Sequence, residues 1–77
     1  MKITIIHKDD CPLCETAIRE FVGDGHDVEV YESIAEIDDA DRRNNMMTDL
    51  LLSRANRNDR PLVFAYDRYI PWKPKGN

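Results

Sequence analysis

The chain has 77 residues, 42% of them hydrophobic, and 11 basic against 15 acidic side chains give a formal net charge of -4. This length corresponds to one small domain, and the composition is that of a folded protein. Net negative charge disfavours nucleic-acid binding by phosphate neutralisation, and no apolar run reaches the roughly 18 residues that span a bilayer. The chain opens on a strand pattern without a cleavable signal, so we expect a cytoplasmic protein that binds neither nucleic acid nor membrane.

Hydrophobic periodicity and turn residues predict six elements in the order β-α-β-α-β-β. In chain order these are a strand over 2–7, a helix over 12–22, a strand over 27–31, a helix over 39–55, and strands over 61–66 and 69–70. The first three elements form a right-handed parallel unit and the last two an antiparallel hairpin. We therefore expect an α/β domain over 1–70, with a four-stranded mixed sheet and two main helices, followed by a mobile tail over 71–77.

Local signals support this order. Residues 3–6 form a continuous β-branched run, which is typical of a buried strand. Asp10 is placed to cap the first helix, and the glycines at 23 and 25 are suited to ending it. The second helix is expected to bury one apolar side, formed by Met46, Met47, Leu50, Leu51 and Ala55.

The only two cysteines, Cys11 and Cys14, lie at the predicted start of the first helix. Two thiols separated by two residues can close a small disulfide ring, and the positive end of a helix favours thiolate over thiol. Cys11 lies at the helix start and is the expected nucleophile, whereas Cys14 lies one turn further in and is the expected resolving thiol. A C-x-x-C motif beside a β-α pattern indicates a redox site, and a cytoplasmic location disfavours a purely structural disulfide.

With these elements in place, the chain resembles a glutaredoxin, the compact form of the thioredoxin fold. The resemblance covers residues 2–70, nearly the whole chain. Three pieces carry it, namely the strand ending in His7-Lys8, the CPLC sequence at 11–14 and the RPLVF sequence at 60–64. The implied activity is thiol–disulfide exchange, in which a mixed disulfide forms on Cys11 and Cys14 displaces the reduced product. The resemblance also implies that the protein needs no bound cofactor.

The resemblance also assigns roles to four residues around the cysteines. It implies a cis bond before Pro61, which faces the cysteines, and a pairing of the Arg60 backbone with the cysteinyl part of a bound thiol substrate. Lys8 matches a lysine that contacts the glycine carboxylate of glutathione, with a solvated loop lysine as the alternative. Leu13 stands where glutaredoxins usually carry an aromatic residue, so we expect an altered substrate preference.

After Ile70 the sequence departs from the glutaredoxin pattern, which continues with a Gly-Gly turn, an acidic residue and a final helix. Here PWKPKGN follows, so the final helix is expected to be absent. This ending is similar to redoxins that take electrons from thioredoxin reductase and feed ribonucleotide reductase. The trimmed form is similar to phage-encoded glutaredoxins. The implied reductant is glutathione or thioredoxin reductase, and the implied substrates are protein or glutathione mixed disulfides, ribonucleotide reductase among them.

Other functions compete with the redox interpretation. A thioredoxin-fold module kept only for binding would need no thiols at redox spacing. A zinc site would have to add His7 or His26 to the two cysteines, and structural zinc usually takes four ligands from two paired clusters. An iron–sulfur cluster shared across a dimer with glutathione is a third alternative, which the available second cysteine disfavours.

Overall fold

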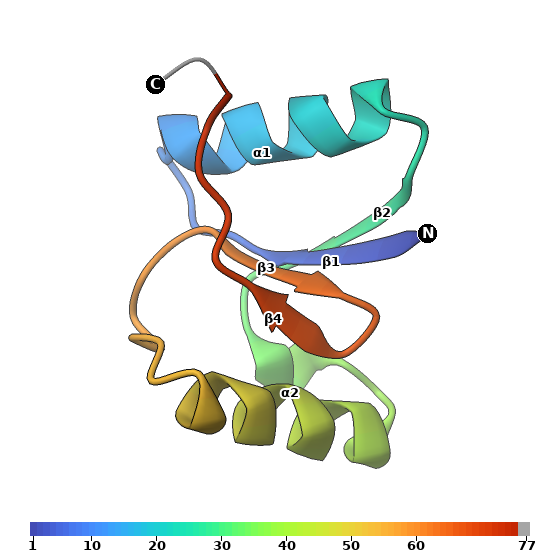
Figure 1. Ribbon diagram of the computed structural model, residues 1–77, viewed down its shortest axis with the longest axis vertical. Helices are drawn as coiled ribbons and strands as arrows, with labels where there is room; N and C mark the ends of the chain where they lie inside the picture. Colours follow the sequence, from blue (N-terminus) through green and yellow to red (C-terminus); the bar gives the residue numbers. More distant parts are fainter. Residues whose placement is uncertain (76–77) are drawn as a thin grey trace.

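A central four-stranded sheet carries one α-helix on each face (Figure 1) in the computed structural model, which describes residues 1–75. The elements are β1 (Lys2–Ile6), α1 (Pro12–Gly23), β2 (Asp27–Tyr31), the 3-10 helix η1 (Ile34–Glu36), α2 (Ala40–Leu52), β3 (Leu62–Ala65) and β4 (Arg68–Ile70). The strands lie in the order β2-β1-β3-β4, with β1 parallel to β2 and the other two pairs antiparallel. The predicted α/β class, element order and mixed sheet are confirmed, and the architecture is a minimal thioredoxin fold.

Strand β1 is the centre of the fold because it pairs with β2 on one side and with β3 on the other. Its side chains alternate between the two faces of the sheet, and residues 3–6 are buried on both faces, as the β-branched run predicted. The α1-side core contains the buried residues Ile3, Ile5, Ala17 and Val63. The α2-side core contains the buried residues Ile6, Ile37, Met46, Leu50, Leu62 and Phe64.

Helix α2 is shorter than predicted and buries fewer residues. Asp39 is its cap and accepts hydrogen bonds from the two backbone N–H groups that follow Ala40, at 2.9 and 3.3 Å. The helix ends at Leu52 because Arg54 turns into the left-handed region, with φ of 57°. The prediction that Leu51 is buried was wrong: it is 69% exposed, since it lies about 100° around the helix from buried Leu50.

The β3–β4 connection is a two-residue turn, one residue earlier than the predicted turn at 67–68. Ala65 pairs with Arg68, and Tyr66 between them has φ of 55°. Tyr66 is exposed in this turn. Tyr69 does pack, edge-on against Phe64 with ring centroids 6.0 Å apart.

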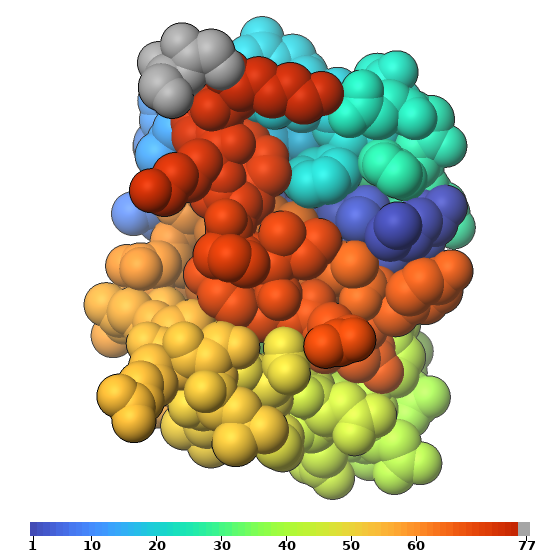
Figure 2. Space-filling model, in the orientation of Figure 1, coloured from blue at the N-terminus to red at the C-terminus, as the bar shows by residue number. Residues whose placement is uncertain are grey.

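The segment after β4 folds back over the α1 side of the sheet. Trp72 packs against the α1-side core, and its backbone N–H donates to the backbone carbonyl of Ile70 at 2.8 Å. Lys75 Nζ pairs with Asp24 Oδ2, at the end of α1, at 3.0 Å. Figure 2 shows this segment in red as a ridge from β4 towards α1. Residues 71–75 are therefore held against the domain, and the predicted tail residues 76–77 lie outside the described residues.

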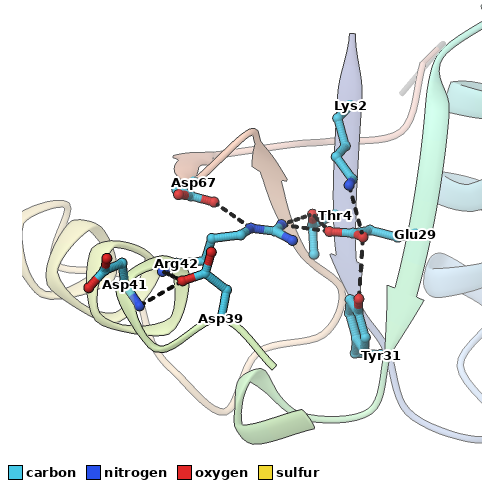
Figure 3. A network of polar contacts seen from close by, with 8 residues as sticks. All are labelled: Lys2, Thr4, Glu29, Tyr31, Asp39, Asp41, Arg42 and Asp67. Carbon is cyan, nitrogen blue, oxygen red and sulfur yellow. Dashed lines mark hydrogen bonds and ion pairs between the residues drawn. The ribbon is translucent and has the colours of Figure 1, made fainter. Parts of the chain in front are cut away.

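A polar network joins α2 to three parts of the sheet (Figure 3). Arg42 donates to Glu29 on β2 at 2.6 Å, to Thr4 on β1 at 3.1 Å and to Asp67 in the β3–β4 turn at 3.1 Å. Lys2 adds a weaker ion pair to Glu29 at 3.5 Å. Burial raises the pKa of Glu29, but hydrogen bonds from Thr4 and Arg42 and the charges of Arg42 and Lys2 outweigh it. The net pKa of Glu29 lies below its ordinary value.

We expect Arg42→Met to lower the free energy of unfolding by about 1–2 kcal/mol at neutral pH, because Glu29 and Asp67 lose their charged donor in a half-buried site. The folded pKa of Glu29 is depressed, so its contribution is complete above the unfolded pKa of about 4.3. That contribution is lost as the pH falls through the lower folded pKa. The stability difference between wild type and variant should therefore shrink in acid.

Urea denaturation of both proteins over a pH series measures this difference. Arg19→Met is the matched control, since it removes the same charge from the exposed side of α1. It should cost less than about 0.5 kcal/mol at every pH. A difference between Arg42→Met and wild type that stays constant into acid would contradict the role assigned to Glu29.

Candidate redox site

Cys11 and Cys14 form a disulfide at the beginning of α1, with their Cα atoms 5.2 Å apart. Cys11 is 7% exposed and Cys14 is 1% exposed, so Cys11 is the residue that an incoming molecule reaches more easily. The backbone N–H of Cys14 donates to Cys11 Sγ at 3.2 Å. In the reduced protein, an N–H at this position and the positive end of α1 would favour thiolate on Cys11.

The cap of α1 is Cys11 itself, and the prediction that Asp10 caps this helix was wrong. Cys11 has the extended backbone of a cap residue, with φ of -117° and ψ of 96°, and its sulfur takes the place of the usual oxygen acceptor. Asp10 has φ of 54°, a left-handed conformation that aspartate tolerates better than most residues. The left-handed turn at Asp10 places Cys11 in the cap position, while the helix begins at Pro12, as predicted.

The loop that precedes β3 lies at the same end of the sheet as the cysteines. Ile6 at the end of β1 pairs with Leu62 at the start of β3, so Pro61 and the segment leading to Cys11 lie at the same end of these two strands. Figure 1 shows both loops at that end of the sheet. The Arg60–Pro61 peptide bond is cis, as the resemblance implied.

The other predicted site residues lie in two places at this end of the sheet, a hollow and the start of α1. Lys8 and Arg60 line one hollow of about 360 Å³, together with His7, Asp9, Glu32 and Asn58. We call it the Lys8 hollow. Leu13 is 49% exposed at the start of α1, between the two cysteines in sequence. The fold thus brings Lys8 and Arg60 together beside the cysteine loop, while neither cysteine lines the hollow itself.

A second and larger hollow adjoins the first, and sequence reasoning did not find it. It has a volume of about 690 Å³ and lies between η1, α2 and the loop before β3. Arg43, Arg57 and Arg60 line it above a floor that includes Ile6, Leu50 and Leu62. We call it the arginine groove. Nothing in the local sequence pattern shows that Arg43 and Arg57 meet, because they belong to different parts of the chain.

The geometry also bears on the zinc alternative. His26 follows the far end of α1, where its ring lies 5.8 Å from that of Phe21, so α1 separates it from the cysteines at its start. Within residues 1–75, no group of three or more His, Cys, Asp or Glu side chains is placed to hold a metal ion.

No helix within residues 1–75 is both long enough and apolar enough to cross a membrane. Comparison with known proteins found no matching family model, no similar curated protein and no similar solved structure. What the structure provides is a minimal thioredoxin fold with a C-x-x-C disulfide at the start of α1. The function of the protein has to be argued from that site.

Proposed function

We propose that this protein is a small cytoplasmic dithiol–disulfide oxidoreductase of the glutaredoxin type. The observation that carries the proposal is the Cys11–Cys14 pair at the start of α1, with the Cys14 N–H directed at Cys11 Sγ. A sulfur that accepts a hydrogen bond at the start of a helix is stabilised as a thiolate. This favours the sulfur both when it attacks and when it leaves. One site of this kind supports both halves of thiol–disulfide exchange.

The reaction begins with the reduced protein. The Cys11 thiolate attacks one sulfur of a substrate disulfide, a Cys11–substrate bond forms, and the other substrate sulfur leaves as a thiolate that takes up a proton. Cys14 then loses its proton and attacks Cys11 Sγ, which closes the internal disulfide and releases the second substrate thiol. The substrate gains two electrons from the two cysteines and two protons, one from Cys14 and one from the solvent that took up the proton of Cys11 when its thiolate formed. Glutathione or thioredoxin reductase would restore the dithiol.

The decisive experiment is a redox titration in graded mixtures of reduced and oxidised glutathione, followed by alkylation of free thiols and intact-mass measurement. We expect one transition between dithiol and internal disulfide, and a glutathione adduct on Cys14→Ser. An internal disulfide without an adduct would assign thioredoxin reductase as the reductant. A chain that forms no internal disulfide at any ratio would overturn the proposed function.

A further inference from the structure

The arginine groove concentrates positive charge in a chain whose net charge is negative. Arg43, Arg57 and Arg60 all line it, and none of the residues within 1–75 that line it is acidic. The whole chain carries 15 acidic side chains and a formal net charge of -4. The groove is therefore a local exception to the overall charge, at the end of the sheet where the disulfide lies.

The three guanidinium groups are not neutralised by the protein. Within residues 1–75, the ion pairs involve other cations, and none includes these arginines. Arg43 donates to the carbonyl oxygen of Ile37, and Arg60 donates to the carbonyls of Arg57 and Asp59 at 2.7 and 2.8 Å. These contacts hold two of the side chains in place while leaving their charge uncompensated. Arg42, one residue from Arg43, shows the contrast, because two carboxylates bind it.

The floor of the groove is apolar, and the groove adjoins the Lys8 hollow beside the cysteine loop. Half-buried Ile34 and Met47 line it above the α2-side core. Asn58 and Arg60 line both the groove and the Lys8 hollow, so the two hollows adjoin. The groove begins at Arg43 in the first turn of α2, and the adjoining hollow ends at residues 7–9, just before Cys11. An extended ligand that fills the arginine groove needs apolar groups for the floor and carboxylates for the rim, whereas the Lys8 hollow is mixed in charge because it also contains Asp9 and Glu32.

We propose that the arginine groove binds an extended acidic segment of a protein substrate, alongside the disulfide that Cys11 attacks. This rests on the proposed function for the identity of the partner as a substrate. Guanidinium groups bind carboxylates through paired hydrogen bonds, and uncompensated charge beside a reaction site raises the rate of encounter with an oppositely charged partner. The groove would thus select acidic protein disulfides over neutral or basic ones.

The test is a binding measurement that needs no redox chemistry. The probe is a short, fluorescein-labelled, cysteine-free peptide of glutamate, leucine and alanine, and a matched peptide carries lysine in place of glutamate. Fluorescence anisotropy with the oxidised protein should show binding of the glutamate peptide only, weakening as salt is added. Arg57→Glu should weaken that binding about threefold to tenfold, since an attractive contact becomes a repulsive one.

Arg54→Glu is the control, because it makes the same charge change on an exposed residue outside the groove. It should change the affinity by less than about twofold. Equal binding of both peptides, or equal losses in the two variants, would overturn the proposal. Displacement of the peptide by free reduced glutathione at similar concentration would also overturn it, by showing a tripeptide site.

The outcomes separate this proposal from the redox function. A normal redox titration with no binding of the glutamate peptide would overturn the groove proposal and leave the oxidoreductase intact. Binding of the peptide by a protein that forms no internal disulfide would overturn the oxidoreductase and support the groove as an acidic-peptide site.

Discussion

Replacing Cys11 by serine is expected to reduce disulfide reduction to the uncatalysed background. The thiolate is the species that attacks, and a serine hydroxyl is not ionised at neutral pH, so no mixed disulfide can form. The assay is reduction of a small disulfide with glutathione in excess, followed through a coupled glutathione reductase. Turnover by Cys11→Ser at the wild-type rate would exclude the proposed mechanism.

Cys14→Ser is the matched partner of this variant, because Cys14 is more deeply buried and follows in the reaction order. It keeps the attacking sulfur and removes the resolving one, so we expect a mixed disulfide that persists and can be detected by mass. Folding is controlled by circular dichroism of both variants, each of which loses one sulfur. If Cys14→Ser forms no adduct while Cys11→Ser does, the two roles are reversed.

Trp72→Ala is expected to lower the free energy of unfolding by about 2–3 kcal/mol. Truncation of a fully buried aromatic residue costs roughly 3–5 kcal/mol, and Trp72 is only partly buried against the α1-side core. In a domain of this size such a loss lowers the Tm by roughly 10 °C or more. The lost side chain covers the sheet on the side of α1, so the effect comes from packing and not from the cysteine site.

Thermal and urea denaturation measure this effect, and Leu51→Ala is the control for loss of an exposed apolar side chain. Leu51 is 69% exposed, so its truncation should cost less than about 0.5 kcal/mol. If Trp72→Ala is no more damaging than Leu51→Ala, the ridge after β4 does not contribute to the fold.

Local patterns made most of the architecture predictable. The β-branched run marked the central strand, because successive β-branched residues are typical of a strand that is buried on both faces. The Cys11–Cys14 motif was evident for a similar reason, since both its chemistry and its place at a helix start are local properties. The cap was missed because sulfur replaces the usual oxygen and nothing in the sequence reveals the left-handed turn at Asp10.

The rest depends on contacts between residues distant in the chain. Arg43, in the first turn of α2, and Arg57 line one groove only because the loop before β3 lies beside α2. The place of Trp72 shows the same dependence, because an aromatic residue beside prolines suits either packing or contact with a partner. Its contact with the α1-side core decides in favour of packing.

The Arg42 network also has a consequence for strand alignment. Strand β2 lies at the edge of the sheet, where Glu29 stands opposite Thr4 of β1. A slip by one residue would turn Glu29 to the other face and leave the Arg42 guanidinium without its shortest contact. The charge on Arg42 therefore favours the observed register of β2 over a register shifted by one residue. Because the residues after β2 form one wall of the arginine groove, fixing this register also fixes the position of that wall.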